Sequence, residues 1–164
     1  MLTKVEPYTP IELIGQMVER YEQEWYTHLT FDQKTTFYTA YGQIERIQWW
    51  YEALEAPGSL AIHFDEKNSG NGILFNNGVQ YGYANGQIIQ EMPRVHDLLV
   101  LGFDIYKQAP LKSVEQLRSV GYDMSKMYTD KWQGKAVWVV GVDAPSDSLA
   151  QFWIEQERLL FVRS

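Results

Sequence analysis

Residues 47–64 read Ile-Gln-Trp-Trp-Tyr-Glu-Ala-Leu-Glu-Ala-Pro-Gly-Ser-Leu-Ala-Ile-His-Phe, and this stretch decides the fold class. Before the turn, Ile47, Trp49, Tyr51 and Ala53 alternate with polar or bulky neighbours at a period of two, which is typical of a half-buried β-strand. Ala56-Pro57-Gly58 interrupts the alternation with residues that favour a turn. The stretch therefore predicts two antiparallel strands with one covered face and one wet face.

The same alternation extends on both sides of this hairpin. It begins near residue 29 and returns in short strands at 73–75 and 79–83. Asn77-Gly78 and Asn85-Gly86 supply residues that tolerate positive φ angles, as tight hairpin turns require. The region from 29 to about 92 is thus predicted to be a meander of consecutive antiparallel strands with short loops.

Helical patterns flank and interrupt the strands. Thr9-Pro10-Ile11-Glu12 is a capping box, in which Thr9 accepts from the Glu12 backbone N–H, and apolar residues follow at helical spacing as far as Trp25. Residues 95–108 and 111–120 predict two short helices, the first of them largely buried. Strands are expected again at 122–132, 135–144, 149–155 and 158–163, with residues 137–140 apolar on both faces, as in a central strand.

Together these patterns predict an α+β fold in a single domain over residues 1–164. We expect one strongly curved antiparallel sheet, an incomplete barrel, with the N-terminal helix and the short helical insert covering its concave face.

Composition excludes several classes of protein. The chain has 164 residues, a net charge of −7 and no cysteine. The acidic balance argues against nucleic-acid binding, which needs basic side chains to neutralise phosphates. The lack of cysteine excludes disulfides, thiolate zinc sites and cysteine nucleophiles. No apolar run reaches the roughly 18 residues that a membrane-spanning helix needs, and no signal-peptide pattern opens the chain.

Catalytic and metal-binding motifs are not evident. His28, His63 and His96 stand in no recognisable active-site pattern, and no pair of ligands has metal-site spacing. Glu155 and Glu157 flank a hairpin turn, where we expect both to be solvated. The sequence therefore predicts a protein that is not an enzyme and that has no cofactor and no metal, although a histidine meeting a carboxylate in a cleft would favour catalysis.

The strongest candidate for a functional surface is the apolar face of the predicted sheet. Aromatic residues make up 15% of the chain. If strand parity holds, one face carries Trp49, Tyr51, Leu60, Ile62, Phe64, Tyr81, Tyr83, Trp138 and Val140. These side chains form either an ordinary core beneath the helices or the lining of an apolar cavity, because a strongly bent sheet encloses more volume than a few short helices fill.

Several stretches, in this order, resemble the LolA-like family of outer-membrane lipoprotein carriers and lipoprotein-sorting proteins. The resemblance runs through residues 50–64, 78–81 and 85–86, then 117, 120–123, 134–141, 151–155 and 159–163. Each motif is short, and their order and spacing over most of the chain carry the resemblance.

The resemblance implies a half-barrel lidded by helices, acting in the periplasm as a carrier and chaperone for lipid transport to the outer membrane. The cavity would hold acyl chains of a lipoprotein or another lipid, with a membrane protein as a possible donor or acceptor. Leu98, Leu99 and Leu101 of the helical insert would complete the ligand-binding lining. The alternative is a protein-interaction or scaffold domain whose core is filled and which binds no ligand.

Overall fold

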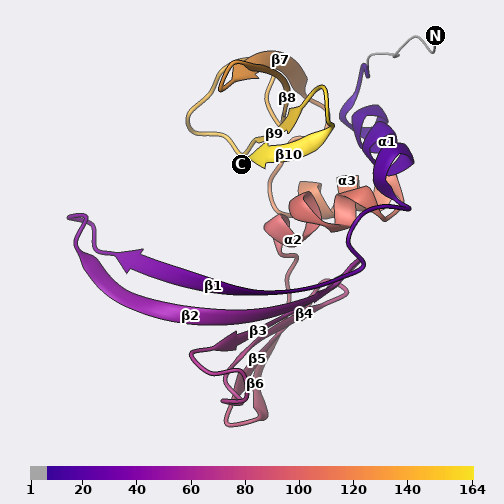
Figure 1. Cartoon of the computed structure of the whole chain (residues 1–164). Coiled ribbons are helices and arrows are strands. Elements are labelled where there is room, and N and C mark those ends of the chain that lie inside the picture. The colour runs from indigo at the N-terminus through magenta and orange to yellow at the C-terminus, as the bar shows by residue number, and fades with distance from the viewer. Residues whose placement is uncertain (1–6) are drawn as a thin grey trace. The chain divides into compact units, whose positions relative to one another are not determined.

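The computed structural model describes residues 7–164, and the chain forms two compact units. We call the first the helical unit; it combines the chain up to Trp25 with Asp97–Ser164. The second, which we call the sheet unit, is formed by Tyr26–His96. Each unit contains one antiparallel sheet, and all the helices belong to the helical unit (Figure 1).

The sheet unit is a meander of six strands, each paired with the next along the chain, as the sequence predicts. Its spatial order is β1-β2-β3-β4-β5-β6. The strands are β1 (His28–Tyr38), β2 (Ile44–Glu55), β3 (Ser59–Phe64), β4 (Gly72–Asn76), β5 (Val79–Ala84) and β6 (Gln87–Pro93). β3 pairs only with Trp50–Glu55 of β2, so the remainder of β2 pairs with β1 alone.

The helical unit combines three α-helices, a short 3-10 helix and a second sheet. The helices are α1 (Pro10–Tyr21), α2 (Asp97–Gly102), η1 (Asp104–Tyr106) and α3 (Pro110–Ser119). The sheet has the order β10-β9-β8-β7, formed by β7 (Met127–Trp132), β8 (Lys135–Val140), β9 (Phe152–Glu155) and β10 (Leu160–Arg163).

The prediction of an α+β fold with antiparallel strands is confirmed, but the prediction of one continuous sheet is wrong. Within residues 7–164, no strand of β1–β6 pairs with a strand of β7–β10, and neither sheet closes into a barrel. The physical reason is that alternation of apolar and polar residues identifies a strand but not the strand with which it pairs. In addition, more than thirty residues, mostly helical, separate β6 from β7. Strong curvature, a single domain and helices over the concave face stay predictions.

The start of α1 follows the predicted capping box. The Thr9 side chain accepts from the Glu12 backbone N–H at 3.4 Å, and Pro10 occupies the first helical position. Glu12 Oε2 in turn accepts from the Tyr8 backbone N–H at 2.8 Å. The first of these bonds satisfies a donor that a helix N-terminus leaves without an intrahelical partner, and the second ties the residue before the cap to the first turn. Leu13, Ile14 and Met17 on one side of the helix are fully buried.

The second sheet is built around β8, which lies between β9 and β7 as the sequence predicts for a central strand. Val137, Trp138, Val139 and Val140 are all buried, so both faces of β8 are covered. Val137 and Val139 form a cluster with Val142, against which Trp132 and Trp153 pack. Trp138 and Val140 are therefore core residues of the helical unit.

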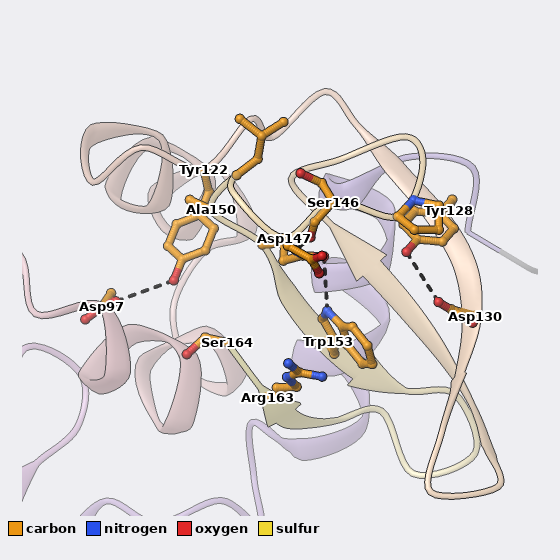
Figure 2. Close-up of a pocket in the computed structure, with 13 residues that line it drawn as sticks. Asp97, Tyr122, Tyr128, Asp130, Ser146, Asp147, Ala150, Trp153, Arg163 and Ser164 are labelled. Atoms are coloured by element: carbon orange, nitrogen blue, oxygen red, sulfur yellow. Dashed lines mark hydrogen bonds between the residues drawn. The ribbon is translucent and has the colours of Figure 1, made fainter. Parts of the chain in front are cut away.

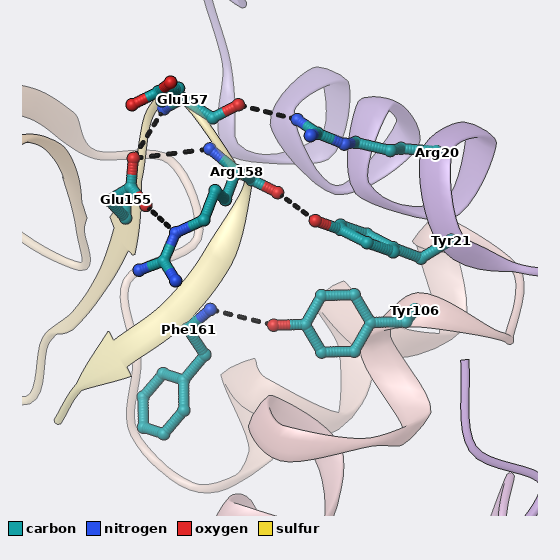
Figure 3. A network of polar contacts seen from close by, with 7 residues as sticks. All are labelled: Arg20, Tyr21, Tyr106, Glu155, Glu157, Arg158 and Phe161. Carbon is teal, nitrogen blue, oxygen red and sulfur yellow. Dashed lines mark hydrogen bonds and ion pairs between the residues drawn. The ribbon is translucent and has the colours of Figure 1, made fainter. Parts of the chain in front are cut away.

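Polar contacts fasten α1 and η1 to the β9–β10 hairpin (Figure 3). Arg20 donates to the Glu157 carbonyl at 2.6 Å, and the Tyr21 hydroxyl donates to the Arg158 carbonyl at 2.5 Å. The buried Tyr106 hydroxyl accepts from the Phe161 backbone N–H at 2.8 Å. Helices and sheet of this unit are thus joined by directional bonds as well as by apolar packing.

The expectation that Glu155 is solvated is wrong. Glu155 is buried. Its carboxylate accepts hydrogen bonds from the backbone N–H of Glu157 at 2.9 Å, from the backbone N–H of Arg158 at 3.3 Å, and from the guanidinium of Arg158. Burial alone would raise the pKa of Glu155, but these donors and the positive charge of Arg158 lower it below its usual value. The carboxylate organises the turn between β9 and β10.

We expect Tyr106→Phe to destabilise the protein by about 1–3 kcal/mol, because it leaves the Phe161 N–H without its acceptor while keeping the ring. Unfolding by urea measures the change. Tyr128→Phe is the control, since the Tyr128 hydroxyl makes only an exposed 3.3 Å bond to Asp130. Equal losses in the two variants would show that the Tyr106 bond is not a significant stabilising contact.

Candidate functional site

The turn between β2 and β3 decides which side chains share a face of the six-stranded sheet. Glu55 pairs with Ser59 across the three residues 56–58, so Leu54 pairs with Leu60 and Trp50 with Phe64. Side chains of directly opposite residues lie on the same face of a sheet. Even-numbered residues of β2 therefore share a face with even-numbered residues of β3.

This register corrects the predicted face. The Trp50 face, as we call it, carries Leu60, Ile62 and Phe64, whereas Trp49 and Tyr51 lie on the opposite Trp49 face with Ala61 and His63. Pairing of β3 with β4 and of β4 with β5 adds Tyr81 and Tyr83 to the Trp49 face. The sequence shows correctly which residues of one strand share a face. Which face of the next strand lies beside them depends on the number of residues in the turn.

The remaining predicted lining residues belong to the helical unit. Leu99 and Leu101 of α2 are buried, as are Trp138 and Val140 of β8, while Leu98 is about half exposed. The first helix of the insert is largely buried as predicted, with Leu98 as an exposed position. The structure gives the four buried residues the role of core packing.

The Trp50 face carries a row of aromatic rings that the sequence analysis missed. Ring centroids of Phe37 and Trp50 lie 6.4 Å apart, and those of Trp50 and Phe64 lie 5.7 Å apart. Phe31 lies on the same face, because it pairs with Glu52. We call Phe31, Phe37, Trp50 and Phe64 the aromatic strip; all four are half-buried. Counting the turn residues would have placed Trp50 with Phe64.

The aromatic strip continues into the buried part of the same face. Leu54, Leu60, Ile62 and Phe75 are each no more than 6% exposed. At the opposite end, Arg46 pairs with Phe37 across the strands, and its guanidinium carbon lies 4.0 Å from the centre of the Phe37 ring. The face is therefore apolar along β2 from Trp50 to Leu54, with one exception.

That exception is Glu52, a buried carboxyl between Trp50 and Leu54. Its Oε1 atom has no hydrogen-bond partner among the described residues, and Gln80 Oε1 on the same face likewise has none. Burial raises the pKa of Glu52 from 4.5 to about 7, since the charged form loses its hydration. Buried oxygens without partners are uncommon in folded proteins and can accept a donor from water or from a ligand.

The Trp49 face is hollowed over β1–β5 by three adjoining depressions of about 580, 540 and 300 Å³. Small or apolar side chains, including Ala53, Ala61 and Leu74, contribute to their surfaces. Polar pairs that include charged groups line two of them: His28 Nε2 lies 3.8 Å from the Glu55 carboxylate, and Lys67 Nζ lies 3.7 Å from Asp32. A ligand filling these hollows would have to displace or desolvate charges that already have partners.

A separate pocket of about 570 Å³ lies in the helical unit (Figure 2). The Tyr122 hydroxyl donates to Asp97 at 3.4 Å, and burial together with that carboxylate raises the pKa of Tyr122 to about 12. Arg163 lies 4.6 Å from the ring centres of both Trp132 and Trp153. Asp130 and Asp147 also line this pocket, so its walls suit polar groups better than an acyl chain.

Comparison of the chain with protein-family models, with curated proteins and with solved structures finds no match. The resemblance to the lipoprotein carriers therefore stays a prediction. Within residues 7–164, no helix is long and apolar enough to cross a membrane. In the same range, no three histidine or acidic side chains converge as metal ligands would.

We expect Glu52 to make the stability of the protein pH-dependent. Because its pKa is higher in the folded than in the unfolded chain, the unfolded state loses its proton first as pH rises, and stability falls between about pH 4.5 and pH 7. We expect Glu52→Gln to remove this loss. The free energy of unfolding of the variant, taken relative to that of the native chain, should then be about 1–3 kcal/mol higher at pH 8 than at pH 4.

Urea unfolding of both proteins across this pH range measures the difference. His63→Gln provides the control for a titrating group that is exposed on the opposite face. Parallel pH profiles for the native chain and Glu52→Gln would contradict the assignment.

Proposed function

We propose that this protein is a non-catalytic binding protein or carrier for the acyl part of an amphipathic ligand, and that the Trp50 face of the six-stranded sheet holds the ligand. The observation that carries the proposal is the aromatic strip, whose rings contact one another and continue into buried aliphatic side chains of the same face. Burial of an acyl chain against such a surface contributes about 0.8 kcal/mol per methylene group.

Two features favour the Trp50 face over the hollows of the Trp49 face. The strip residues are half-buried rings, so each keeps apolar surface that a ligand can cover. The Trp49 face instead contains the ion pair Lys67–Asp32 and the Glu55 carboxylate, 3.8 Å from His28 Nε2, beside its hollows. An acyl chain gains most where covering the surface removes no hydrated charge from water.

The resemblance to the lipoprotein carriers supports the same ligand chemistry. A carrier in the periplasm, receiving an acylated protein or another lipid from a membrane donor and passing it to an acceptor, is the biological role that we propose on that basis. The alternative role is a protein-interaction or scaffold domain, for which the Trp50 face would serve only as a core.

Trp50→Ala is the test of the proposed surface. The full chain, freed of bound lipid, is titrated with a dansyl-labelled fatty acid, and binding is followed by dansyl fluorescence. We expect saturable binding by the native chain and affinity about tenfold lower in Trp50→Ala, because an aromatic contact contributes about 0.5–1.5 kcal/mol beyond its buried area.

Trp49→Ala is the matched control, since it removes the same side chain from the adjacent residue on the opposite face. We expect its affinity to stay within about twofold of the native value. Absence of saturable binding to the native chain would overturn the proposal in favour of a scaffold. A larger loss in Trp49→Ala than in Trp50→Ala would overturn the choice of face.

A further inference from the structure

We infer that the ligand is a long-chain acyl compound with an anionic headgroup, and that Arg46 binds this headgroup at the outer end of the aromatic strip. The inference rests on the proposed function and names the class of ligand. It is carried by the position, the partners and the orientation of the Arg46 side chain.

Arg46 lies on the same face as the strip. It pairs with Phe37 across β1 and β2, and the guanidinium carbon lies 4.0 Å from the centre of the Phe37 ring. A guanidinium held over an aromatic ring can still donate N–H groups to a carboxylate or phosphate, so arginine can combine the two contacts.

In the described residues, no acidic side chain forms an ion pair with Arg46. In the described part of the chain, no ion pair or hydrogen bond of its guanidinium is found, although the chain as a whole carries 21 acidic residues. Lys67 of the same unit differs, since its Nζ lies 3.7 Å from Asp32. Arg46 is therefore a cation next to an apolar surface, and the N–H groups of its guanidinium are available to an anion.

Distance along the strand fits one acyl chain. Arg46, Gln48 and Trp50 follow one another on this face, and the four steps from Arg46 to Trp50 span about 14 Å at roughly 3.4 Å per residue. An acyl chain of a membrane lipid extends over about half of a 30 Å hydrocarbon core, or about 15 Å. A headgroup at Arg46 thus places the chain along the aromatic strip as far as Trp50.

Charge sets the direction of the ligand. Glu52, the next residue beyond Trp50 on this face, becomes negative above about pH 7, so it repels an anionic headgroup and favours the neutral end of the ligand on its side of the strip. Arg46 attracts the headgroup at the near end. The two charges favour one orientation of an anionic lipid and offer no such preference to an uncharged one.

The test compares dodecanoate with 1-dodecanol, which share a chain length and differ in charge. Binding of each to the full chain is measured at pH 8 by the change in tryptophan fluorescence, for the native protein, Arg46→Gln and Lys34→Gln. Lys34→Gln is the matched control, because Lys34 is an exposed cation on the same hairpin that pairs with Trp49 and lies on the opposite face.

We expect Arg46→Gln to weaken dodecanoate binding about tenfold or more and to leave dodecanol binding within about twofold. Lys34→Gln should change both by less than about twofold. Equal weakening of dodecanoate binding by the two variants, or equal loss of both ligands in Arg46→Gln, would overturn the inference. Circular dichroism of each variant checks that the fold is retained.

Failure of the inference differs from failure of the proposed function. If neither compound binds the native chain, the proposed function itself is wrong. If both bind the native chain and Arg46→Gln affects neither, acyl binding stands and the role of Arg46 is wrong.

Discussion

The pairing of Glu55 with Ser59 across a three-residue turn is the constraint on which the surfaces of the sheet unit depend. One residue more or fewer in the turn would move Leu60, Ile62 and Phe64 to the face of Trp49, because side chains alternate with a period of two. The turn itself requires Gly58, which has a φ of +103°. A Cβ atom there would lie 2.9 Å from Asn77 Oδ1, so a larger residue would be strained and crowded.

Two apolar surfaces with different properties follow from this register. On the Trp50 face, aromatic rings contact one another and lead to buried aliphatic residues, with Glu52 as the only buried carboxyl among them. On the Trp49 face, small side chains leave shallow hollows beside polar pairs that include charged groups. The contrast between the faces, more than the size of any hollow, is what favours one of them as an acyl-binding surface.

The sequence predicts the elements of this fold well and the relations between them less well. The capping box at Thr9, the central position of β8 and the meander of β1–β6 all depend on local patterns, and all are confirmed. The division into two sheets depends on which strands pair after a long helical insert, and alternation carries no information about that.

The candidate site shows the same limit at the level of single residues. The sequence shows that Trp50 and Trp49 lie on opposite faces of β2, but it does not show which of them shares a face with Ile62 and Phe64. The β2–β3 register places Trp50 on that face, whereas the sequence predicts Trp49 there. Leu99, Leu101, Trp138 and Val140 are correctly recognised as residues of a covered surface, but they cover the core of the helical unit. Glu155 is buried because a turn supplies donors that composition does not reveal.

The part of β2 that precedes Trp50 has strand pairing on one side only, since β3 begins its pairing at Trp50. A ladder of two strands is marginally stable by itself, so the segment from Ile44 to Trp49 opens at lower free energy than the strands next to it. We expect backbone amides there to exchange with solvent deuterium sooner than those of β3 and β4. The outer half of the hairpin can thus separate and close again while the rest of the sheet stays folded, which makes it the most easily deformed portion of the sheet.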